Sequence, residues 1–206
     1  LDFEKNGVDL AVGCTYKYGN SGPGSPGWLF VSKSIQKELR VPIQGWFAQQ
    51  MQFEMGPYFE PADTIRRYQI ATPSIIGIRA VEVAYEMIER AGIALIEQKA
   101  ARGTELMMDL FKQWLEPLGF EIASPSEAAL RGGHIILTHP DARQIAYAMR
   151  KISKVIPDYR EPNAIRVAIS PLATSYTEVF EGFSRLRDLV ESGNYKSIEQ
   201  DANRVT

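Results

Sequence analysis

A lysine between two tyrosines, Lys17 with Tyr16 and Tyr18, is the residue best suited to covalent chemistry. It follows the apolar run of residues 8–14 and precedes a Gly- and Pro-rich loop, residues 19–27. A lysine at the end of a buried strand can lie in a partly desolvated pocket, where its pKa falls and the neutral amine becomes a nucleophile. This position suits imine formation with an aldehyde cofactor. The ordinary alternative is a solvated surface lysine.

The loop after Lys17 does not match the usual nucleotide-binding loops. It lacks the Gly-Lys-Ser/Thr ending of a P-loop and the strand-to-helix setting of a dinucleotide fingerprint. Its glycines would instead let the backbone approach a bound ring or phosphate closely.

Histidine and cysteine offer no second centre of chemistry. His134 and His139 flank the apolar residues 135–137 without a further ligand at useful spacing, so we expect structural histidines and no metal site. Cys14 lies on the strand expected before Lys17, and we interpret it as a small packed hydrophobe.

The elements that must position Lys17 are a strand over residues 8–14, expected to be buried on both faces, and a second strand over residues 28–31. A short helical stretch should follow at residues 34–39. Residues 41–73 contain many aromatics but neither helical nor strand periodicity, which predicts an ordered, irregular segment that helps to form a site.

Helical periodicity starts at Ser74, and the helix should end at Gly92. Its apolar stripe comprises Ile75, Ile78, Val81, Ala84, Tyr85 and Ile88. A long connecting helix is expected over residues 93–115. The remaining pattern predicts a small α+β domain with strands at residues 120–123, 134–138 and 165–169, and with helices at residues 141–153, where Asp141 is a suitable N-cap, and 177–192.

Bulk composition indicates a soluble globular protein of 206 residues, 45% hydrophobic and 23% charged. A net charge of -2 argues against nucleic acid or anionic lipid as a partner, and no apolar run approaches the roughly 20 residues that cross a bilayer. A single cysteine fits the reducing cytoplasm. Because the chain opens on Leu1 and soon enters a strand, we expect a fragment of a longer protein.

Several motifs in one order resemble the C-terminal half of kynureninases, which are fold-type I, class V aminotransferase-like enzymes that use pyridoxal 5'-phosphate (PLP). The likeness runs from residue 7 to about residue 189. Its motifs are Val8-Asp9-Leu10-Ala11-Val12-Gly13-Cys14-Thr15-Tyr16-Lys17-Tyr18, Asn20, Gly22-Pro23-Gly24, Gly45-Trp46-Phe47, Asp158-Tyr159-Arg160-Glu161-Pro162-Asn163, Ile165-Arg166 and Pro171-Leu172.

This resemblance implies an α/β fold made of two parts. Residues 1–92 would form the end of the large PLP-binding domain, with the Schiff-base lysine, and residues 93–206 the connecting helix and the small C-terminal α+β domain. The pyridine-nitrogen aspartate, the ring-stacking aromatic and most of the phosphate cup would come from an N-terminal half of the same enzyme.

The resemblance also assigns roles to single residues. Lys17 would be the catalytic Schiff-base residue and the base that moves the substrate α-proton, and Tyr16 would donate a hydrogen bond to the cofactor phosphate. Trp46 and Thr72 would reach the phosphate bound by a neighbouring subunit, which implies a homodimer with shared sites. Arg166 would clamp the substrate α-carboxylate, a pairing that guanidinium makes bidentately.

From the residues alone, plainer roles stay open for three of these positions. Trp46 could be a core aromatic, Thr72 a helix N-cap ahead of Pro73, and Arg166 one member of a surface ion pair.

The substrate-binding residue expected next to Trp46 departs from the family pattern. Kynureninases usually continue Gly-Trp-Phe with Gly-His, whereas this chain has Ala48-Gln49. Gln49 can donate and accept hydrogen bonds but cannot shuttle a proton near neutral pH.

The implied reaction is hydrolytic cleavage of the Cβ–Cγ bond of kynurenine or 3-hydroxykynurenine, as in tryptophan catabolism and NAD biosynthesis. It would give alanine and anthranilate or 3-hydroxyanthranilate. The alternatives are another class V PLP enzyme, such as an aminotransferase or desulfurase, and a non-catalytic assembly subunit.

Overall fold

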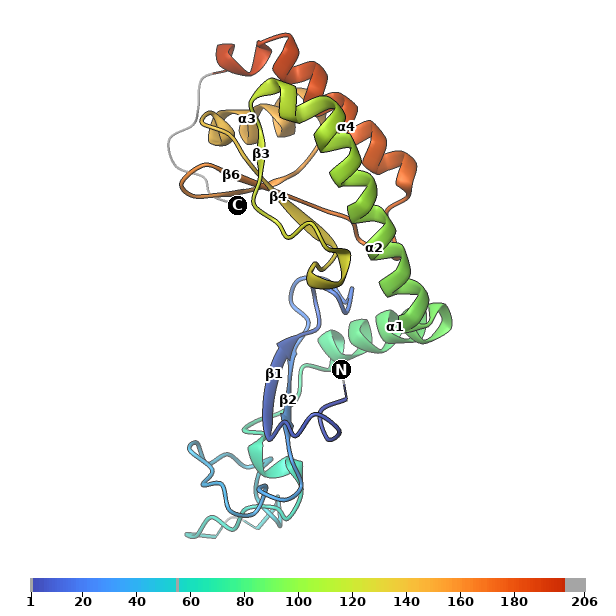
Figure 1. The fold of residues 1–206 in the computed structure, drawn as a ribbon. Helices are drawn as coiled ribbons and strands as arrows, with labels where there is room; N and C mark the ends of the chain where they lie inside the picture. The colour runs from blue at the N-terminus through green and yellow to red at the C-terminus, as the bar shows by residue number, and fades with distance from the viewer. Residues whose placement is uncertain (1, 55, 199–206) are drawn as a thin grey trace. The chain divides into compact units, whose positions relative to one another are not determined.

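A computed structural model describes residues 2–54 and 56–198. The expectation that the chain starts inside a longer protein concerned Leu1, which lies outside the described residues. The chain divides into two compact units, Leu1–Arg90 and Ala91–Thr206 (Figure 1).

The first unit is built on a two-stranded antiparallel ribbon of β1 (Leu10–Cys14) and β2 (Gly27–Val31) (Figure 1). Cys14 is paired with Gly27, so the Gly- and Pro-rich loop joins the two strands as a hairpin connection. Gly13 is required because the indole of Trp28 would lie 2.3 Å from a Cβ at that position. Both expected strands are therefore confirmed, with β1 starting two residues later than predicted.

The expectation that β1 is buried on both faces is wrong for this chain. On one face of the ribbon, Phe3 packs on the rings of Trp28 and Phe30. On the other face Leu10 and Val12 are exposed, Val12 by 78%. An antiparallel ribbon needs a second layer to bury both faces, and the sequence pattern alone does not show whether this chain supplies that layer.

Irregular backbone fills most of the segment between β2 and the first long helix. Residues 33–38 form turns and not the short helix expected at 34–39. Further on, Gln49 pairs with Pro61 in an isolated bridge, and Ile65–Tyr68 form a 3-10 turn. The described part of this segment is thus irregular but hydrogen-bonded, as expected.

Helix α1 (Ile75–Ala91) closes the first unit. It begins at Ser74, whose Oγ accepts a hydrogen bond from the Gly77 N–H at 3.3 Å. Thr72 is therefore not its N-cap. Helix α1 ends at Gly92, whose φ of 81° lies in the region that favours glycine. The predicted helix is confirmed, but half of its apolar stripe is exposed and only Ala84 in that stripe is buried.

The second unit opens with α2 (Ile93–Leu110), which continues as a π-helical turn at Phe111–Leu115 and a 3-10 turn at Glu116–Leu118. This agrees with the helix expected over residues 93–115. Gly119, with a φ of 86°, ends the segment.

A four-stranded sheet forms the centre of the second unit. It comprises β3 (Glu121–Ile122), β4 (His134–Thr138), β5 (Asp158–Arg160) and β6 (Ala164–Ala168). The order is β3-β4-β6-β5 and every neighbouring pair is antiparallel. Strand β5 was not predicted, because three residues are too few to show alternation.

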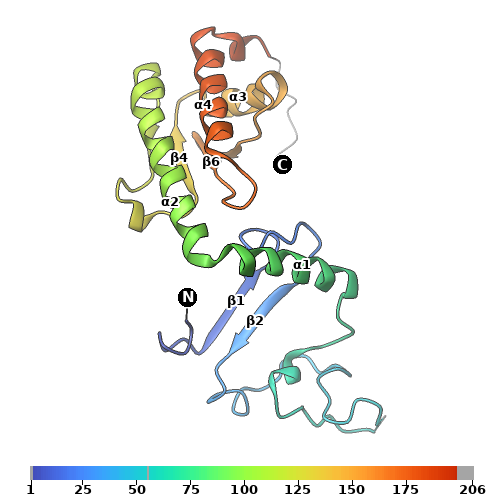
Figure 2. The ribbon, with the colours of Figure 1, turned by 90° about the vertical axis from the view of Figure 1, so that its right-hand side faces the viewer.

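The helices of this unit are α2, α3 (Ala142–Ala148), which continues as a π-helical turn at Met149–Ser153, and α4 (Tyr176–Glu191) (Figure 2). Short 3-10 turns lie at Ala128–Leu130 and Asn194–Ser197.

Side chains at the helix starts behave differently from one helix to the next. Ser175 and Glu178 form a reciprocal capping box that fixes the start of α4. Asp141 stands at the N-cap position of α3, but its carboxylate accepts a hydrogen bond from the Tyr195 hydroxyl at 2.9 Å and does not cap the helix.

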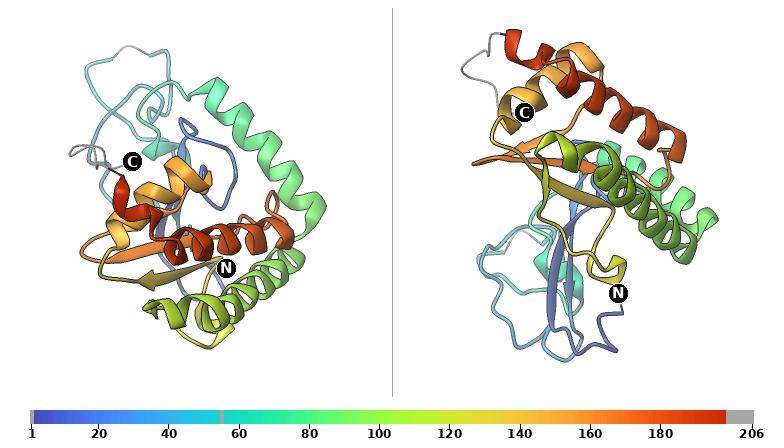
Figure 3. Two further views of the ribbon diagram at one scale, coloured as in Figure 1. Left: turned by 90° about the horizontal axis from the view of Figure 1, so that it is seen from above. Right: turned by 45° about the horizontal axis from the view of Figure 1, so that its top comes forward.

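The helices cover one face of the sheet, and the buried core lies between the helices and this face (Figure 3). Ile135, Leu137 and Ile165 point into this core and are fully buried. Alternate residues point to the opposite face. Ile136 and its partner Arg166 belong to that second face and are only partly buried.

Candidate functional site

Lys17 lies in a tight turn just beyond β1. Thr15 is buried and anchors this turn, because its hydroxyl donates a hydrogen bond to the Pro26 carbonyl at 2.6 Å. The Asn20 N–H closes the turn on the Lys17 carbonyl at 2.9 Å. Gly19 is needed here, since a Cβ would lie 2.3 Å from the Thr15 carbonyl oxygen. The turn therefore presents the Lys17 side chain on a fixed backbone.

The amine of Lys17 is exposed and lies 4.9 Å from the centre of the Tyr16 ring. Hydrogen bonding to Tyr16, followed by the Cys14 thiol, raises the pKa of Lys17 above its ordinary value of 10.5. The expected lowering of this pKa is wrong for the chain by itself, because the amine meets water, a phenol and a thiol and not an apolar enclosure. Enclosure by further residues would be needed to reverse the direction.

Trp46 lies on an irregular loop that is held from several sides. Its ring packs edge-on against Phe47 at 4.5 Å, yet 44% of the residue is exposed. Gly45 permits close backbone contact, since a Cβ would be 2.0 Å from the Ile70 carbonyl oxygen. The indole is therefore not a core residue; it lines a hollow of about 290 Å³ together with Gln49, Tyr58 and Phe59, among others.

Gln49 and Arg66 tie this loop together. The Gln49 amide donates to the Tyr58 carbonyl at 3.3 Å and accepts from the Glu60 N–H at 3.0 Å. The Arg66 guanidinium donates to the carbonyls of Phe47 at 3.2 Å and Gln50 at 3.1 Å. No sequence pattern indicated the Arg66 contacts, which join residues 19 and 16 positions apart. Contact of Gln49 with a substrate stays a prediction.

Thr72 is exposed in the connection between this loop and α1. Because Ser74 takes the capping role, the Thr72 hydroxyl is not needed at the helix start. Its proposed contact with a cofactor phosphate stays a prediction.

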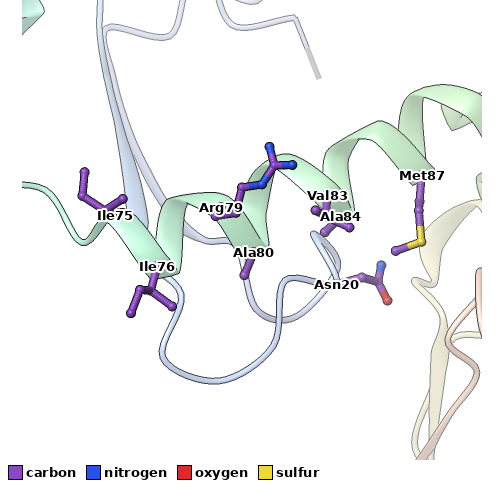
Figure 4. A pocket seen from close by; sticks show the side chains of 8 residues that line it. All are labelled: Asn20, Ile75, Ile76, Arg79, Ala80, Val83, Ala84 and Met87. Carbon is purple, nitrogen blue, oxygen red and sulfur yellow. The ribbon is translucent and has the colours of Figure 1, made fainter.

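A shallow apolar hollow of about 580 Å³ runs along α1 (Figure 4). Asn20, from the loop after Lys17, lies beside Ala84 and Met87 of the helix (Figure 4). Ile76 at the other end of the hollow is 88% exposed. Asn20 of the loop that follows Lys17 and the bare side of α1 thus line the same hollow.

Arg166 belongs to the second unit, on the face of the sheet away from the helices. Its guanidinium donates to the Asp158 carboxylate, which lies opposite it in the register of β5 and β6. The Arg166 side chain is 38% exposed and the Asp158 side chain 30%. Arg166 is thus a member of a half-buried ion pair, and its guanidinium is still open to solvent on one side.

His139 has a structural role. Its Nδ1 accepts a hydrogen bond from the Asp141 N–H at 3.0 Å, and its ring packs on Phe120 at 4.7 Å. Burial lowers the pKa of His139. In the part of the chain that the structure describes, no three His, Cys, Asp or Glu side chains gather in a way that would hold a metal ion.

Comparison with known proteins identifies relatives of this chain. The kynureninase C-terminal domain family matches residues 96–186. Kynureninase from Pseudomonas fluorescens is 34% identical over 191 residues, which are 93% of this chain and 46% of that enzyme. The Bacillus anthracis and Geobacillus thermodenitrificans kynureninases are each 36% identical, over 96% and 98% of this chain.

The chain is homologous to the C-terminal half of kynureninases. It spans about half the length of the curated relatives that it matches.

Solved structures show the same fold. Cysteine desulfurase from Thermococcus onnurineus NA1 superposes with a TM-score of 0.77 at 16% identity, over 92% of this chain and 49% of that one. A C-DES mutant with glycine covalently linked to its PLP cofactor superposes with a TM-score of 0.73 at 17% identity, over 91% of this chain and 48% of that one. The fold is that of the C-terminal half of a fold-type I PLP enzyme, as the kynureninase resemblance implied.

Across the described residues, no helix combines the length and apolar character that crossing a bilayer requires.

Proposed function

We propose that this chain is the C-terminal half of a cytoplasmic, PLP-dependent kynureninase. The enzyme would hydrolyse the Cβ–Cγ bond of kynurenine or 3-hydroxykynurenine to give alanine and anthranilate or 3-hydroxyanthranilate. The observation that carries this proposal is the presentation of Lys17 and Tyr16 on a rigid turn beyond β1, in a chain homologous to kynureninases.

The residues around Lys17 fit a PLP group. The amine is exposed on a fixed turn, so an aldehyde can reach it. Tyr16 is also exposed and brings a phenolic O–H to the same side. When bound, PLP supplies an aldehyde that condenses with amines and a ring that withdraws electrons from the substrate α-carbon.

Three residues of this chain then have defined roles. Lys17 Nζ would hold the cofactor, and the same amine would take the proton from the substrate α-carbon. The Tyr16 hydroxyl donates to the cofactor phosphate. Arg166 receives the substrate α-carboxylate.

Trp46 and Thr72 would act on the site of a neighbouring subunit. Both are exposed, and hydrogen bonds from Gln49 and Arg66 hold the loop that carries Trp46 in place. In a homodimer with shared sites, their N–H and O–H donors would bind the phosphate of the partner's cofactor.

The N-terminal half of the same enzyme would complete each site. The bare faces of β1 and α1 support this proposal, because exposed aliphatic side chains on two regular elements are typical of a surface that another layer covers. Such a layer would also desolvate Lys17 and lower its pKa toward the range in which the neutral amine reacts.

Desulfurase chemistry is the second candidate, because cysteine desulfurases share the fold of this chain. Their identities of 12–16% show the fold alone, whereas the relatives at 34–36% are kynureninases. The kynureninase reaction is therefore the better supported of the two.

A turnover assay with matched lysine variants tests the proposal. The full-length enzyme is expected to release alanine and anthranilate from kynurenine, and Lys17→Ala is expected to abolish release because no other group would hold the cofactor and move the α-proton. Lys33→Ala, which removes an exposed lysine beyond β2, should keep full activity. Release of pyruvate or sulfide from other amino acids, with none from kynurenine, would contradict the assignment in favour of another PLP chemistry.

A further inference from the structure

Two arginines share one carboxylate on the open face of the second unit's sheet. Asp158 Oδ2 accepts from Arg160 Nε at 3.0 Å and from Arg160 Nη2 at 2.7 Å. The same oxygen accepts from Arg166 Nη2. Asp158 therefore lies between two guanidinium groups.

The strand register places all three side chains on one face. Asp158 is paired with Arg166 across β5 and β6, and Arg160, two residues along β5, is paired with Ala164. Because alternate strand residues share a face, Arg160 and Asp158 point to the same side as Arg166. Ala164, which lies opposite Arg160, has no polar side chain. The Arg160 guanidinium therefore pairs with Asp158 on its own strand.

The charges of this cluster do not cancel. One carboxylate and two guanidinium groups carry a net charge of about +1 at neutral pH. If Asp158 faced Arg166 alone, that pair would be neutral, and an incoming carboxylate would have to compete with Asp158 for the guanidinium. Arg160 offsets this competition, because it donates two further hydrogen bonds to the same carboxylate oxygen.

We propose that Arg160 is a positioning residue for the substrate: it balances the charge of Asp158, so that Asp158 orients Arg166 without neutralising it. This inference rests on the proposed function, in which Arg166 receives an amino-acid carboxylate. Arg160 itself does not touch the substrate.

Ligand titration of the full-length, PLP-loaded enzyme tests this inference. L-alanine and L-alaninamide serve as paired probes, because they differ in the carboxylate that Arg166 would bind. Their dissociation constants are measured from the change in the visible spectrum of the cofactor, which does not depend on turnover. Arg185→Gln is the matched control, since Arg185 forms an exposed ion pair with Glu181 on α4.

Arg160→Gln is expected to raise the Kd for L-alanine roughly three- to tenfold, as suits the loss of one charge near a partly exposed anion site. The Kd for L-alaninamide should change less than about twofold, and Arg185→Gln should leave both values unchanged.

The decisive variant removes both charges. In Arg160→Gln combined with Asp158→Asn, the net charge returns to +1, and the amide oxygen introduced by the second substitution still accepts from Arg166. The Kd for L-alanine should return to within about twofold of the wild-type value. A purely structural role for Arg160 predicts the opposite, because a second lost contact would then make binding weaker.

Two results would overturn the inference. One is an Arg160→Gln variant that binds L-alanine like the Arg185→Gln control, and the other is a double variant that binds no better than Arg160→Gln. In either case, release of alanine and anthranilate from kynurenine by the same variants would show that the proposed function stands without it. If Arg166→Gln leaves L-alanine binding intact, the inference fails together with the assignment of Arg166.

Discussion

Lys17 combines a well-defined backbone position with an electrostatic setting that is not yet that of a catalytic amine. Its turn is fixed by Thr15 and Asn20, but its amine is solvated and its pKa lies above the ordinary value of 10.5. A lysine with a raised pKa is almost fully protonated near neutral pH and reacts slowly with electrophiles. In this chain alone, the fixed turn is present and the lowered pKa is not.

Tyr16→Phe is predicted to lower the pKa of Lys17 in the 206-residue chain, because hydrogen bonding to Tyr16 is the largest cause of its elevation. Nuclear magnetic resonance of the lysine Cε carbons against pH would measure this. The signal of Lys17 should titrate above 10.5 in the wild type and closer to 10.5 in the variant.

Tyr18→Phe is the control for this measurement, since Tyr18 flanks the lysine on its other side and the hydrogen bond to Tyr16 is the largest cause of the raised pKa. The rate at which an amine-reactive reagent modifies Lys17 should rise with pH up to the pKa of Lys17. Tyr16→Phe should move this curve of rate against pH to lower pH. A curve that moves to higher pH would contradict the assigned cause.

How far single residues could be predicted from sequence depended on how local their contacts are. Lys17 and Arg166 were singled out because short motifs surround them, and their roles stay predictions. The Gln49 and Arg66 contacts were not, because they join positions 9 to 19 residues apart through backbone carbonyls and N–H groups. The raised pKa of Lys17 was also missed, since the sequence does not say what encloses an amine.

At the scale of elements, the second unit follows its sequence pattern closely. The helix at 177–192 and the strand at 134–138 were predicted within a residue, because the helical periodicity and the apolar residues 135–137 are clear there. The first unit agrees less well. Its two strands and its helix were predicted, but the exposure of their apolar side chains was not. Apolar periodicity shows which face of an element can be buried, and not whether another layer covers that face.

Alanine substitutions at two helical glycines are predicted to change stability in opposite directions. Gly182, within α4, would carry a Cβ with no atom within 4 Å, whereas a Cβ at Gly103 in α2 would lie 2.6 Å from Ile169 Cδ1 and 3.1 Å from its Cγ2. Gly182→Ala should stabilise the second unit by about 1 kcal/mol through helix propensity alone. Gly103→Ala should destabilise it by roughly 1–2 kcal/mol, because Ile169 is buried and cannot move aside freely.

Thermal unfolding measures both changes. The Gly182→Ala variant should unfold at a higher temperature than the wild type, and Gly103→Ala at a lower one. Equal shifts of the same sign would show that the two helix faces are not packed as described.

At the scale of the whole molecule, the chain is half of a PLP-enzyme fold. It covers 46–47% of the related kynureninases and 48–49% of the cysteine desulfurase and C-DES chains that share its fold. Its bare apolar faces and its solvated Lys17 both lie in the first unit. Both are what we expect of a site that needs an N-terminal half to bury its apolar surface and to desolvate its amine.

The most direct test of this account is to locate PLP on the chain. Full-length enzyme loaded with PLP is reduced with borohydride and digested, and the peptides are sequenced by mass spectrometry. We predict a pyridoxyl group on Lys17, and its loss in Lys17→Ala but not in Lys33→Ala. A pyridoxyl group on another lysine, or equal labelling of the Lys17→Ala variant, would contradict the central claim.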